Sequence, residues 1–444
     1  MKCLIQCAVL LLLTLASCSA DKVQERRPNI ILIMADDMGY ECLSCNGSVS
    51  YKTPNLDRFA ENGARFTKCI SQPLCTPSRV KIMTGRYNYR NYCDFGYLDI
   101  KEKTFGNILQ EEGYRTAVVG KWQLNGLGTK REGWEDNQRP AHFGFDEYCL
   151  WQLTKPRKQG ERYANPLIEQ NGKVLTGLEK QYGPDIFSNY VLNFIERNKE
   201  QPFFIYYPMV LVHDPFVATP DSEGWEVKRN RFKNNKKYFK DMVEYTDKII
   251  GQIVQKLKDE GIWENTILMF TGDNGTNISI TSETVNGAYK GGKGTTPDAG
   301  THVPFVASWP AQIKEGFVYD ELVEFSDFLP TIAQAGEAKV PTNIDGKSFL
   351  NVLRRNKHKD RETVLVHYDP MKRMRPPRYP GRFVRTKQYK LYHDGRFFNL
   401  EKDKLEQTPL DEQKLTSKEK QIKQELEQLQ KECPEWKQSE KTHQ

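Results

Sequence analysis

The 444-residue chain has no internal repeat, no low-complexity tract and no long apolar segment beyond Ala20, and each absence excludes a class of protein. No later segment holds the roughly 18 apolar residues that a transmembrane helix needs, which excludes a polytopic membrane protein. With 38% hydrophobic and 28% charged residues, the composition is typical of a water-soluble globular protein rather than a collagenous or disordered one. At about 150 residues per domain, the length allows up to three domains, or one large α/β domain with an appendage.

The chain also lacks a large excess of positive or negative charge. Sixty-five Lys and Arg residues against 58 Asp and Glu residues leave a net charge of +7, too small to indicate a nucleic-acid partner but suited to an anionic substrate. Two basic stretches stand out, Lys228 to Lys240 and Lys372 to Arg382. We interpret each either as a solvated face or as a cationic rim that gathers a polyanionic glycan.

The first twenty residues have the pattern of an export signal. Lys2 is followed by an apolar run from Cys3 to Ala16 that is too short to span a bilayer. Two ways of processing this signal remain open. Leu15-Ala16-Ser17-Cys18 resembles a bacterial lipobox, which predicts a lipoprotein anchored through Cys18, whereas cleavage after Ala20 predicts a soluble protein. The mature protein is therefore predicted to be periplasmic, outer-membrane-anchored or secreted, with a lipid anchor as its one membrane attachment.

Cysteine is sparse beyond this leader, and its pattern does not favour a zinc site. Cys42 and Cys45 form a C-x-x-C pair, but no second pair and no histidine cluster accompanies them, so packed thiols or one ordinary bridge are favoured. The number of downstream cysteines is odd, which leaves at least one unpaired. They are Cys42, Cys45, Cys69, Cys75, Cys93, Cys149 and Cys433.

Four apolar, β-rich runs without alternation predict strands buried on both faces of a largely parallel sheet. These are Asn29 to Ala35, Thr116 to Gly120, Phe203 to Val212 and Thr266 to Thr271. Polar residues follow each run, and parallel strands bring their carboxyl ends to one edge, where open α/β folds bind ligands. The residues expected to meet there are Asp36 and Asp37, Lys121, His213, and Asp273 and Asn274.

The stretches between and after these strands predict a two-part organisation. Residues 242–257 carry apolar side chains at helical spacing, and this alternation of strand and helix predicts an α/β fold for residues 21–350. In residues 351–444, three short alternating runs, an Asp394-Gly395 turn and a helix opened by a Thr416–Glu419 capping box predict a small antiparallel subdomain. The runs are Val364 to Tyr368, Tyr389 to His393 and Phe397 to Leu400.

Cys75 to Arg79 form a candidate reactive segment at a predicted helix start. Thr76 is a favourable N-cap, Pro77 suits the first turn and Gly85 is a plausible end. Cys75 would then lie at the positive end of a helix, a place that stabilises an anion, with Arg79 adding a fixed cation one turn later. The alternative is a structural thiol near a turn.

These residues also carry a family resemblance. Cys75-x-Pro77-x-Arg79 with Thr84-Gly85-Arg86 resembles the signature of the formylglycine-dependent sulfatases of the alkaline-phosphatase superfamily. The resemblance implies a mixed, largely parallel sheet flanked by helices, with a smaller C-terminal antiparallel subdomain. It extends over Pro28-Asn29-Ile30, Asp36-Asp37-Met38-Gly39, Thr53-Pro54-Asn55-Leu56-Asp57, Gly120-Lys121-Trp122, Thr271-Gly272-Asp273-Asn274-Gly275 and Gly292-Lys293-Gly294-Thr295.

The acidic residues at the strand ends predict a divalent metal site. Their oxygen ligands suit a hard cation, with Ca²⁺ as the first choice and Mg²⁺ as the alternative, and no nearby His or Cys pattern favours zinc or copper. Without a cation the crowded carboxylates would repel one another. The predicted ligands are Asp36, Asp37, Asp273 and Asn274, and the resemblance adds the modified Cys75.

The resemblance also implies a reaction. A formylglycine-generating or anaerobic maturase enzyme oxidises Cys75 to an aldehyde, and a hydroxyl of its hydrate attacks the sulfur of a sulfate ester. Arg79 would then support the formylglycine, and Lys121 and Lys293 would bind sulfate oxygens. His213 would contact the sulfate and protonate the leaving group. From export and the basic stretches, we expect a sulfated carbohydrate as substrate.

Two departures from the family pattern leave other functions open. The family commonly has a histidine where this chain has Gln123, and a Glu-Gly-Gly-x-Arg-x-Pro stretch appears here as residues 298–304, with His302 in the arginine position. Glutamine takes no proton at neutral pH, so His302 could supply the missing base, although a structural role is favoured. The alternatives are a phosphonate monoester or phosphodiester hydrolase of the same superfamily, and a non-catalytic glycan-binding lipoprotein.

We hypothesise that Gln123 only positions the hydrated aldehyde while another group or water accepts the proton. On this hypothesis Gln123→His keeps or raises the turnover of a small aryl sulfate, because the imidazole supplies a base where the amide supplies none. Steady-state kinetics on the purified variant measures the effect. Loss of turnover in a variant whose circular dichroism spectrum matches that of the native protein would contradict the hypothesis.

Overall fold

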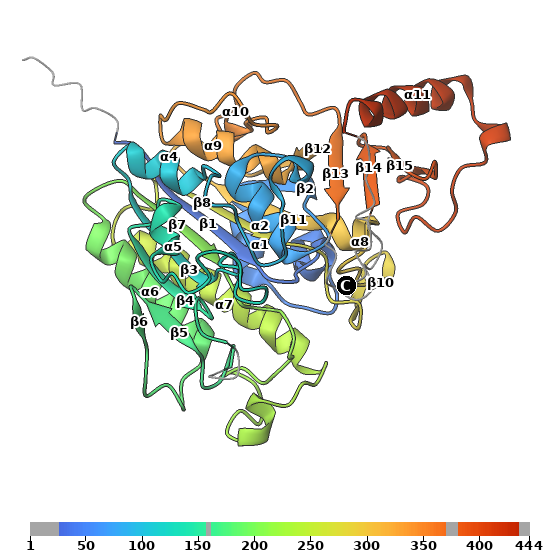
Figure 1. The fold of residues 1–444 in the computed structure, drawn as a ribbon. Coiled ribbons are helices and arrows are strands. Elements are labelled where there is room, and N and C mark those ends of the chain that lie inside the picture. The colour runs from blue at the N-terminus through green and yellow to red at the C-terminus, as the bar shows by residue number, and fades with distance from the viewer. Residues whose placement is uncertain (1–25, 157–160, 370–380, 435–444) are drawn as a thin grey trace, which may run out of the picture.

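A mixed, largely parallel sheet forms the centre of the molecule (Figure 1). The computed structural model describes residues 26–156, 161–369 and 381–434. The ten strands of this sheet are β1 (Asn29–Ala35), β2 (Ala64–Ile70), β3 (Arg115–Lys121), β4 (Glu147–Trp151), β5 (Ile168–Gln170), β6 (Lys173–Val174), β7 (Phe203–Pro208), β8 (Thr266–Gly272), β11 (His302–Ser308) and β12 (Phe317–Glu324). Their order is β12-β2-β11-β8-β1-β7-β3-β4-β5-β6, and the five neighbours from β8 to β4 run parallel. The predicted fold class is confirmed.

Three of the four predicted strands match closely, but the prediction that the third reaches Val212 is wrong. β7 ends at Pro208, which has no N–H for a ladder bond. The chain beyond it instead bonds around Asp36, whose amide donates to the Leu211 carbonyl at 2.6 Å and whose carbonyl accepts from the Val212 amide at 2.7 Å. His213 therefore follows a loop that wraps the end of β1, rather than a strand end.

Helices cover both faces of the sheet because β1 is apolar on both. Ile30, Leu32 and Met34 pack into one core with α2 (Cys75–Thr84), α4 (Phe105–Glu111), α9 (Phe328–Ala335) and α10 (Leu350–Leu353). Ile31 and Ile33 pack into the other core with α1 (Pro54–Glu61), α6 (Gly183–Asn198) and α7 (Tyr238–Asp259). Shorter helices and 3-10 turns complete the main unit: α3 (Asn88–Asn91), α5 (Arg139–His142), α8 (Asp298–Thr301), η1 (Tyr40–Cys42), η2 (Ser44–Asn46), η4 (Lys228–Arg231) and η5 (Phe325–Asp327).

A second, antiparallel sheet follows the main unit, as predicted. It contains β13 (Val364–Tyr368), β14 (Gly381–Arg385), β15 (Tyr389–Tyr392) and β16 (Phe397–Asn399), and α11 (Ser417–Lys431) lies against β14 and β15 (Figure 1). The predicted capping box is present, with Thr416 accepting from the Glu419 amide. β9 (Thr281–Thr284) and β10 (Gly287–Lys290) form a hairpin, and η6 (Glu412–Lys414) precedes α11. The boundary between residues 350 and 351 stays a prediction.

The predicted leader, residues 1–20, lies outside the described residues, as does most of the basic stretch from Lys372 to Arg382. Within the described part of the chain, no helix combines the length and the apolar character needed to cross a membrane.

A buried ionic cluster joins the two sheets. Asp298, at the start of α8, accepts from Arg385 Nη1 at 2.9 Å through both oxygens and from Lys390 Nζ at 3.1 Å. The Arg385 and Lys390 side chains are only 3% and 0% exposed. Burial opposes the charge of Asp298, but these two cations hold its pKa well below the usual value. The carboxylate is therefore needed in its ionised form to hold the C-terminal sheet in place.

Asp298→Asn should lower the free energy of unfolding by about 3–5 kcal/mol at pH 7, because the buried Arg385 loses its counter-charge and Lys390 keeps only Glu406. In the native protein this contribution is present above the unfolded-state pKa of about 4 and is lost as the pH falls further, because the pKa is lower in the folded state. Urea unfolding against pH measures both effects.

The matched control is Asp394→Asn, which breaks a solvent-exposed ion pair with Arg396 on the β15–β16 turn. A loss below about 1 kcal/mol is expected there. Equal losses in the two variants would contradict the importance of the buried cluster.

Candidate active site

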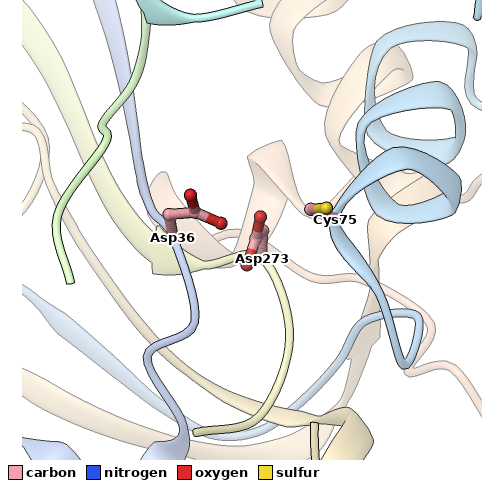
Figure 2. A group of neighbouring side chains, drawn as sticks. All are labelled: Asp36, Cys75 and Asp273. Atoms are coloured by element: carbon pink, nitrogen blue, oxygen red, sulfur yellow. The ribbon is translucent and has the colours of Figure 1, made fainter. Parts of the chain in front are cut away.

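The predicted acidic ligands meet at the ends of two adjacent strands. Asp36 and Asp37 follow β1, Asp273 and Asn274 follow β8, and the pairing of Ala35 with Gly272 aligns the two strand ends. The Asp37 amide donates to Asp273 Oδ1 at 3.0 Å. All four side chains are fully buried. Figure 2 shows Asp36 and Asp273 beside each other, with Cys75 at the start of α2.

These residues fit a divalent cation. A carboxylate oxygen from each of Asp36 and Asp273 and the Cys75 Sγ lie within 4.8 Å of one another. Asn274 Nδ2 donates to Asp37 Oδ1 at 2.9 Å, which leaves the buried Asn274 Oδ1 without a hydrogen-bond partner. A buried oxygen without a partner is costly, and hard cations prefer oxygen ligands. The geometry therefore suits Ca²⁺ or Mg²⁺ without selecting between them.

Basic side chains neutralise the carboxylates. Lys121 Nζ lies 2.8 and 2.9 Å from the two oxygens of Asp36, and Arg162 Nη1 lies 3.1 Å from Asp36 Oδ2. Arg79 Nη2 lies 3.0 Å from Asp273 Oδ2. Burial opposes the charge of Asp36, but the cations around it, led by Lys121, hold its pKa well below the usual value. Burial and the charge of Asp36 raise the pKa of Asp273. The two carboxylates therefore differ in how firmly they hold a negative charge.

Arg162 was not predicted from the sequence. It lies in an irregular segment between β4 and β5, and its guanidinium stacks over the Trp151 ring at 4.3 Å. No motif or periodic pattern marks Glu161-Arg162-Tyr163, so only the tertiary fold brings this cation to Asp36.

Helix α2 begins at Cys75 and ends before Gly85, which has φ 67°. The end is as predicted, but the prediction that Thr76 caps the helix is wrong. Leu74 occupies the N-cap position, and the Thr76 hydroxyl instead accepts from the Gly96 amide at 3.1 Å. Within the helix, Arg79 Nη1 donates to the Lys121 carbonyl at 2.7 Å, which ties α2 to the end of β3.

The environment of Cys75 does not favour a thiolate. The side chain lies at the positive end of α2, as expected, but burial raises the pKa of the thiol, and the nearby carboxylates of Asp273 and Asp36 raise it further. The expected stabilisation of an anion is therefore outweighed by desolvation. An unmodified Cys75 is a neutral thiol and a poor nucleophile.

His213 lies beside the acidic cluster with its tautomer set by the backbone. Its Nδ1 is 2.6 Å from the Asp214 carbonyl oxygen, which can only accept, so Nδ1 carries the proton. Nε2 is then the free ring nitrogen, 3.7 Å from Asp37 Oδ2. Burial, together with the Arg162 cation, lowers the pKa of His213 to about 3, so the ring is neutral near pH 7.

Lys293 completes the cationic groups. It lies between β10 and α8, and its ammonium group donates to Asp37 Oδ2. Burial disfavours the charge, but Asp37 raises the pKa of Lys293 above its usual value, so the residue stays protonated. Lys121 and Lys293 thus place two fixed positive charges, one on Asp36 and one on Asp37.

Gln123 and His302 differ in their relation to this cluster. Gln123 follows Lys121 by two residues, has φ 54°, and keeps its buried Oε1 without a hydrogen-bond partner. His302 lies on β11, stacks on Tyr40 at 4.1 Å and bonds through Nε2 to the Thr67 carbonyl at 2.8 Å. These contacts give His302 a structural role.

The remaining sequence features lie apart from the acidic cluster. The seven described cysteines are all free thiols, including Cys42 and Cys45. Among the described residues, two groups of side chains could hold a metal ion. Both include Asp36, and neither contains this C-x-x-C pair. The basic stretch from residue 228 to 240 forms η4 and the start of α7, and most of its charged side chains are exposed.

Comparison with known proteins identifies a family whose fold agrees with the architecture described above. The family model described as Sulfatase matches residues 28–338, and the model described as N-sulphoglucosamine sulphohydrolase, C-terminal, matches residues 294–432. Arylsulfatase A of Homo sapiens is 31% identical over 408 residues, covering 83% of this chain and 75% of its own. N-acetylgalactosamine-6-sulfatase of Mus musculus is 30% identical over 378 residues, covering 75% and 68%.

A solved structure of Ps i-CgsB in complex with k-i-k-neocarrahexaose is also similar. It superposes with a TM-score of 0.74 at 28% identity and covers 92% of each chain. These matches define a sulfuric ester hydrolase of alkaline-phosphatase-like fold. The chain belongs to the sulfatase family.

Arg162→Gln should lower kcat/KM for an aryl sulfate by about 10- to 100-fold, because Asp36 loses a cation that orients and ionises it. The matched control is Arg231→Gln, since Arg231 also stacks on a tryptophan, Trp225 at 5.2 Å, but on η4. Steady-state kinetics on both variants measures the difference. Equal activities of Arg162→Gln and the native enzyme would show that Asp36 does not need this partner.

Proposed function

We propose that this sulfatase removes sulfate from a sulfated carbohydrate after a maturase enzyme has converted Cys75 to formylglycine. The single observation that supports the proposal best is the position of Cys75. Its Sγ lies at the start of α2, within 4.8 Å of ligand atoms of Asp36 and Asp273. Since burial keeps the thiol neutral, the residue gains a useful nucleophile by conversion: formylglycine supplies a hydroxyl for attack on sulfur.

We assign the divalent ion to Asp36, Asp37, Asp273, Asn274 and the modified Cys75, with Ca²⁺ preferred over Mg²⁺. The orphaned Asn274 Oδ1 and the all-oxygen set of protein donors support this assignment. A cation bound there would supply positive charge that helps neutralise the sulfate group and orients the oxygen of residue 75.

Lys121 and Lys293 are assigned to the sulfate oxygens. Each lies beside a carboxylate of the cluster, Lys121 beside Asp36 and Lys293 beside Asp37. Fixed cations of this kind stabilise the charge that develops on the sulfuryl oxygens. Arg79 supports the site through Asp273 and the Lys121 carbonyl, so it holds residue 75 and Lys121 in one arrangement.

His213 is assigned to the leaving oxygen. Because Nδ1 donates to the Asp214 carbonyl, Nε2 is the atom that exchanges a proton with the substrate. In the free enzyme this nitrogen is unprotonated, so His213 must gain a proton before it can act as an acid. An anionic substrate favours that step by adding negative charge beside the ring.

A basic stretch and a relative's name support the carbohydrate substrate, and the leader supports the location. The exposed basic stretch from residue 228 to 240 can gather a polyanionic chain, and the name of the mouse relative specifies a sulfated amino sugar. The leader predicts export, either as a lipoprotein or in soluble form. No feature of the charge pattern suggests nucleic acid as a partner.

Mass spectrometry of the intact peptide spanning Cys75, taken from protein expressed in its native host, tests the proposal. We expect the mass of the aldehyde, and a kcat/KM for aryl sulfate that exceeds the value for aryl phosphonate. Cys75→Ala, with Cys93→Ala as the exposed-thiol control, should lose all sulfatase activity. A thiol at residue 75 and no sulfate release would favour the glycan-binding alternative, and preference for the phosphonate would favour the other hydrolase.

A further inference from the structure

A cavity lies next to residues of the active site, and the proposed mechanism gives it no role. It has a volume of about 480 Å³, within the range of small-molecule sites. We call it the aromatic pocket, because rings and carboxamides dominate its walls. The lining residues used below are Phe95, Gln123, Lys130, Trp134, Trp151 and Gln152.

One chain connection and two contacts place the aromatic pocket next to the reacting groups. Gln123 follows Lys121 by two residues. Gly96, another lining residue, donates its amide to the Thr76 hydroxyl at 3.1 Å, directly after Cys75. Trp151 lies under Arg162, whose guanidinium reaches Asp36 at 3.1 Å. A group attached to a sulfate held at Lys121 and Cys75 therefore has this cavity beside it.

Backbone strain is concentrated on the walls of the aromatic pocket. Gln123, Lys130 and Gln152 have φ angles of 54°, 50° and 52°, which account for three of the nine non-glycine residues described with positive φ. A left-handed conformation of a non-glycine residue costs about 1 kcal/mol or more, and such residues gather at ligand sites. These three backbone positions lie together at the aromatic pocket.

The lining chemistry matches a sugar ring better than an aryl or steroid group. Phe95 and Trp134 are half-buried on the lining, and aromatic rings pack well against the apolar C–H side of a pyranose. Gln152 is half-buried on the wall, and its carboxamide offers both a donor and an acceptor to sugar hydroxyls. An aryl ring offers this carboxamide no comparable hydrogen-bond partners.

A lysine at the aromatic pocket indicates which charge the preferred ligand carries. Lys130 is exposed at the pocket, and its Nζ lies 5.7 Å from the centre of the Trp134 ring. A cation beside an aromatic wall favours a sugar that carries an anionic group over a neutral one.

We propose that the aromatic pocket binds the pyranose unit that carries the scissile sulfate, with Gln152 bonding its hydroxyls and Trp134 packing on its ring. This inference rests on the proposed sulfatase function and specifies its substrate. The pocket, not the acidic cluster, selects sugar sulfates over aryl sulfates.

Gln152→Gly tests the proposal without loss of fold, because glycine adopts φ 52° freely. Kinetics of the matured enzyme are compared on 4-nitrophenyl sulfate and on a panel of monosulfates of D-galactose, N-acetyl-D-galactosamine and N-acetyl-D-glucosamine. We expect the ratio of kcat/KM for the best sugar to that for the aryl ester to fall at least about tenfold, mainly through KM. Glu337→Gly is the matched control, because Glu337 also has positive φ but lies exposed after α9, and the ratio should not change.

The outcomes separate this inference from the function on which it rests. Hydrolysis of the aryl ester without hydrolysis of any sugar in the panel, or an equal loss on both substrates in Gln152→Gly, overturns the assignment of the aromatic pocket and leaves the sulfatase function intact. Absence of sulfate release from every ester by protein that carries the aldehyde overturns the sulfatase function and the pocket together.

Discussion

The burial of three carboxylates at one edge of the sheet is the constraint on which the rest of the structure depends. Asp36, Asp37 and Asp273 are fully buried at the adjoining ends of β1 and β8. Like charges so close in a low-dielectric interior are strongly unfavourable unless cations and hydrogen bonds offset them. Basic side chains from four separate segments form ion pairs with these carboxylates: Arg79, Lys121, Arg162 and Lys293.

Because of the same constraint, the acidic cluster and its surroundings have different roles. Groups that must carry charge are buried and fixed by ion pairs. The aromatic pocket beside them is built from rings, carboxamides and strained backbone, which suit recognition of a particular shape. In a family that acts on one kind of bond, reaction chemistry and substrate choice can therefore vary separately.

Much of the fold and cluster could be predicted because their signals are local. Buried parallel strands have unalternating apolar runs, and β1 and β8 match the predictions within a residue. The errors occur where tertiary contacts override local preference. Thr76 is a good N-cap by type, yet its hydroxyl bonds to Gly96, and β7 ends early because the chain turns to bond around Asp36. Arg162 has no local signal at all, since its role comes from a cation–carboxylate contact with a strand 126 residues away in sequence.

The sequence by itself determined the strands, the acidic residues that follow them and the helix that ends before Gly85, and its motifs carried the family resemblance. The strands, the acidic residues and the helix follow from periodicity, residue chemistry and spacing, which are properties of neighbouring residues. Only the tertiary structure decided the protonation of Cys75 and His213, the partners of the carboxylates and the walls of the aromatic pocket. Those depend on desolvation and on distances between segments far apart in the chain, and neither quantity exists until the chain has folded.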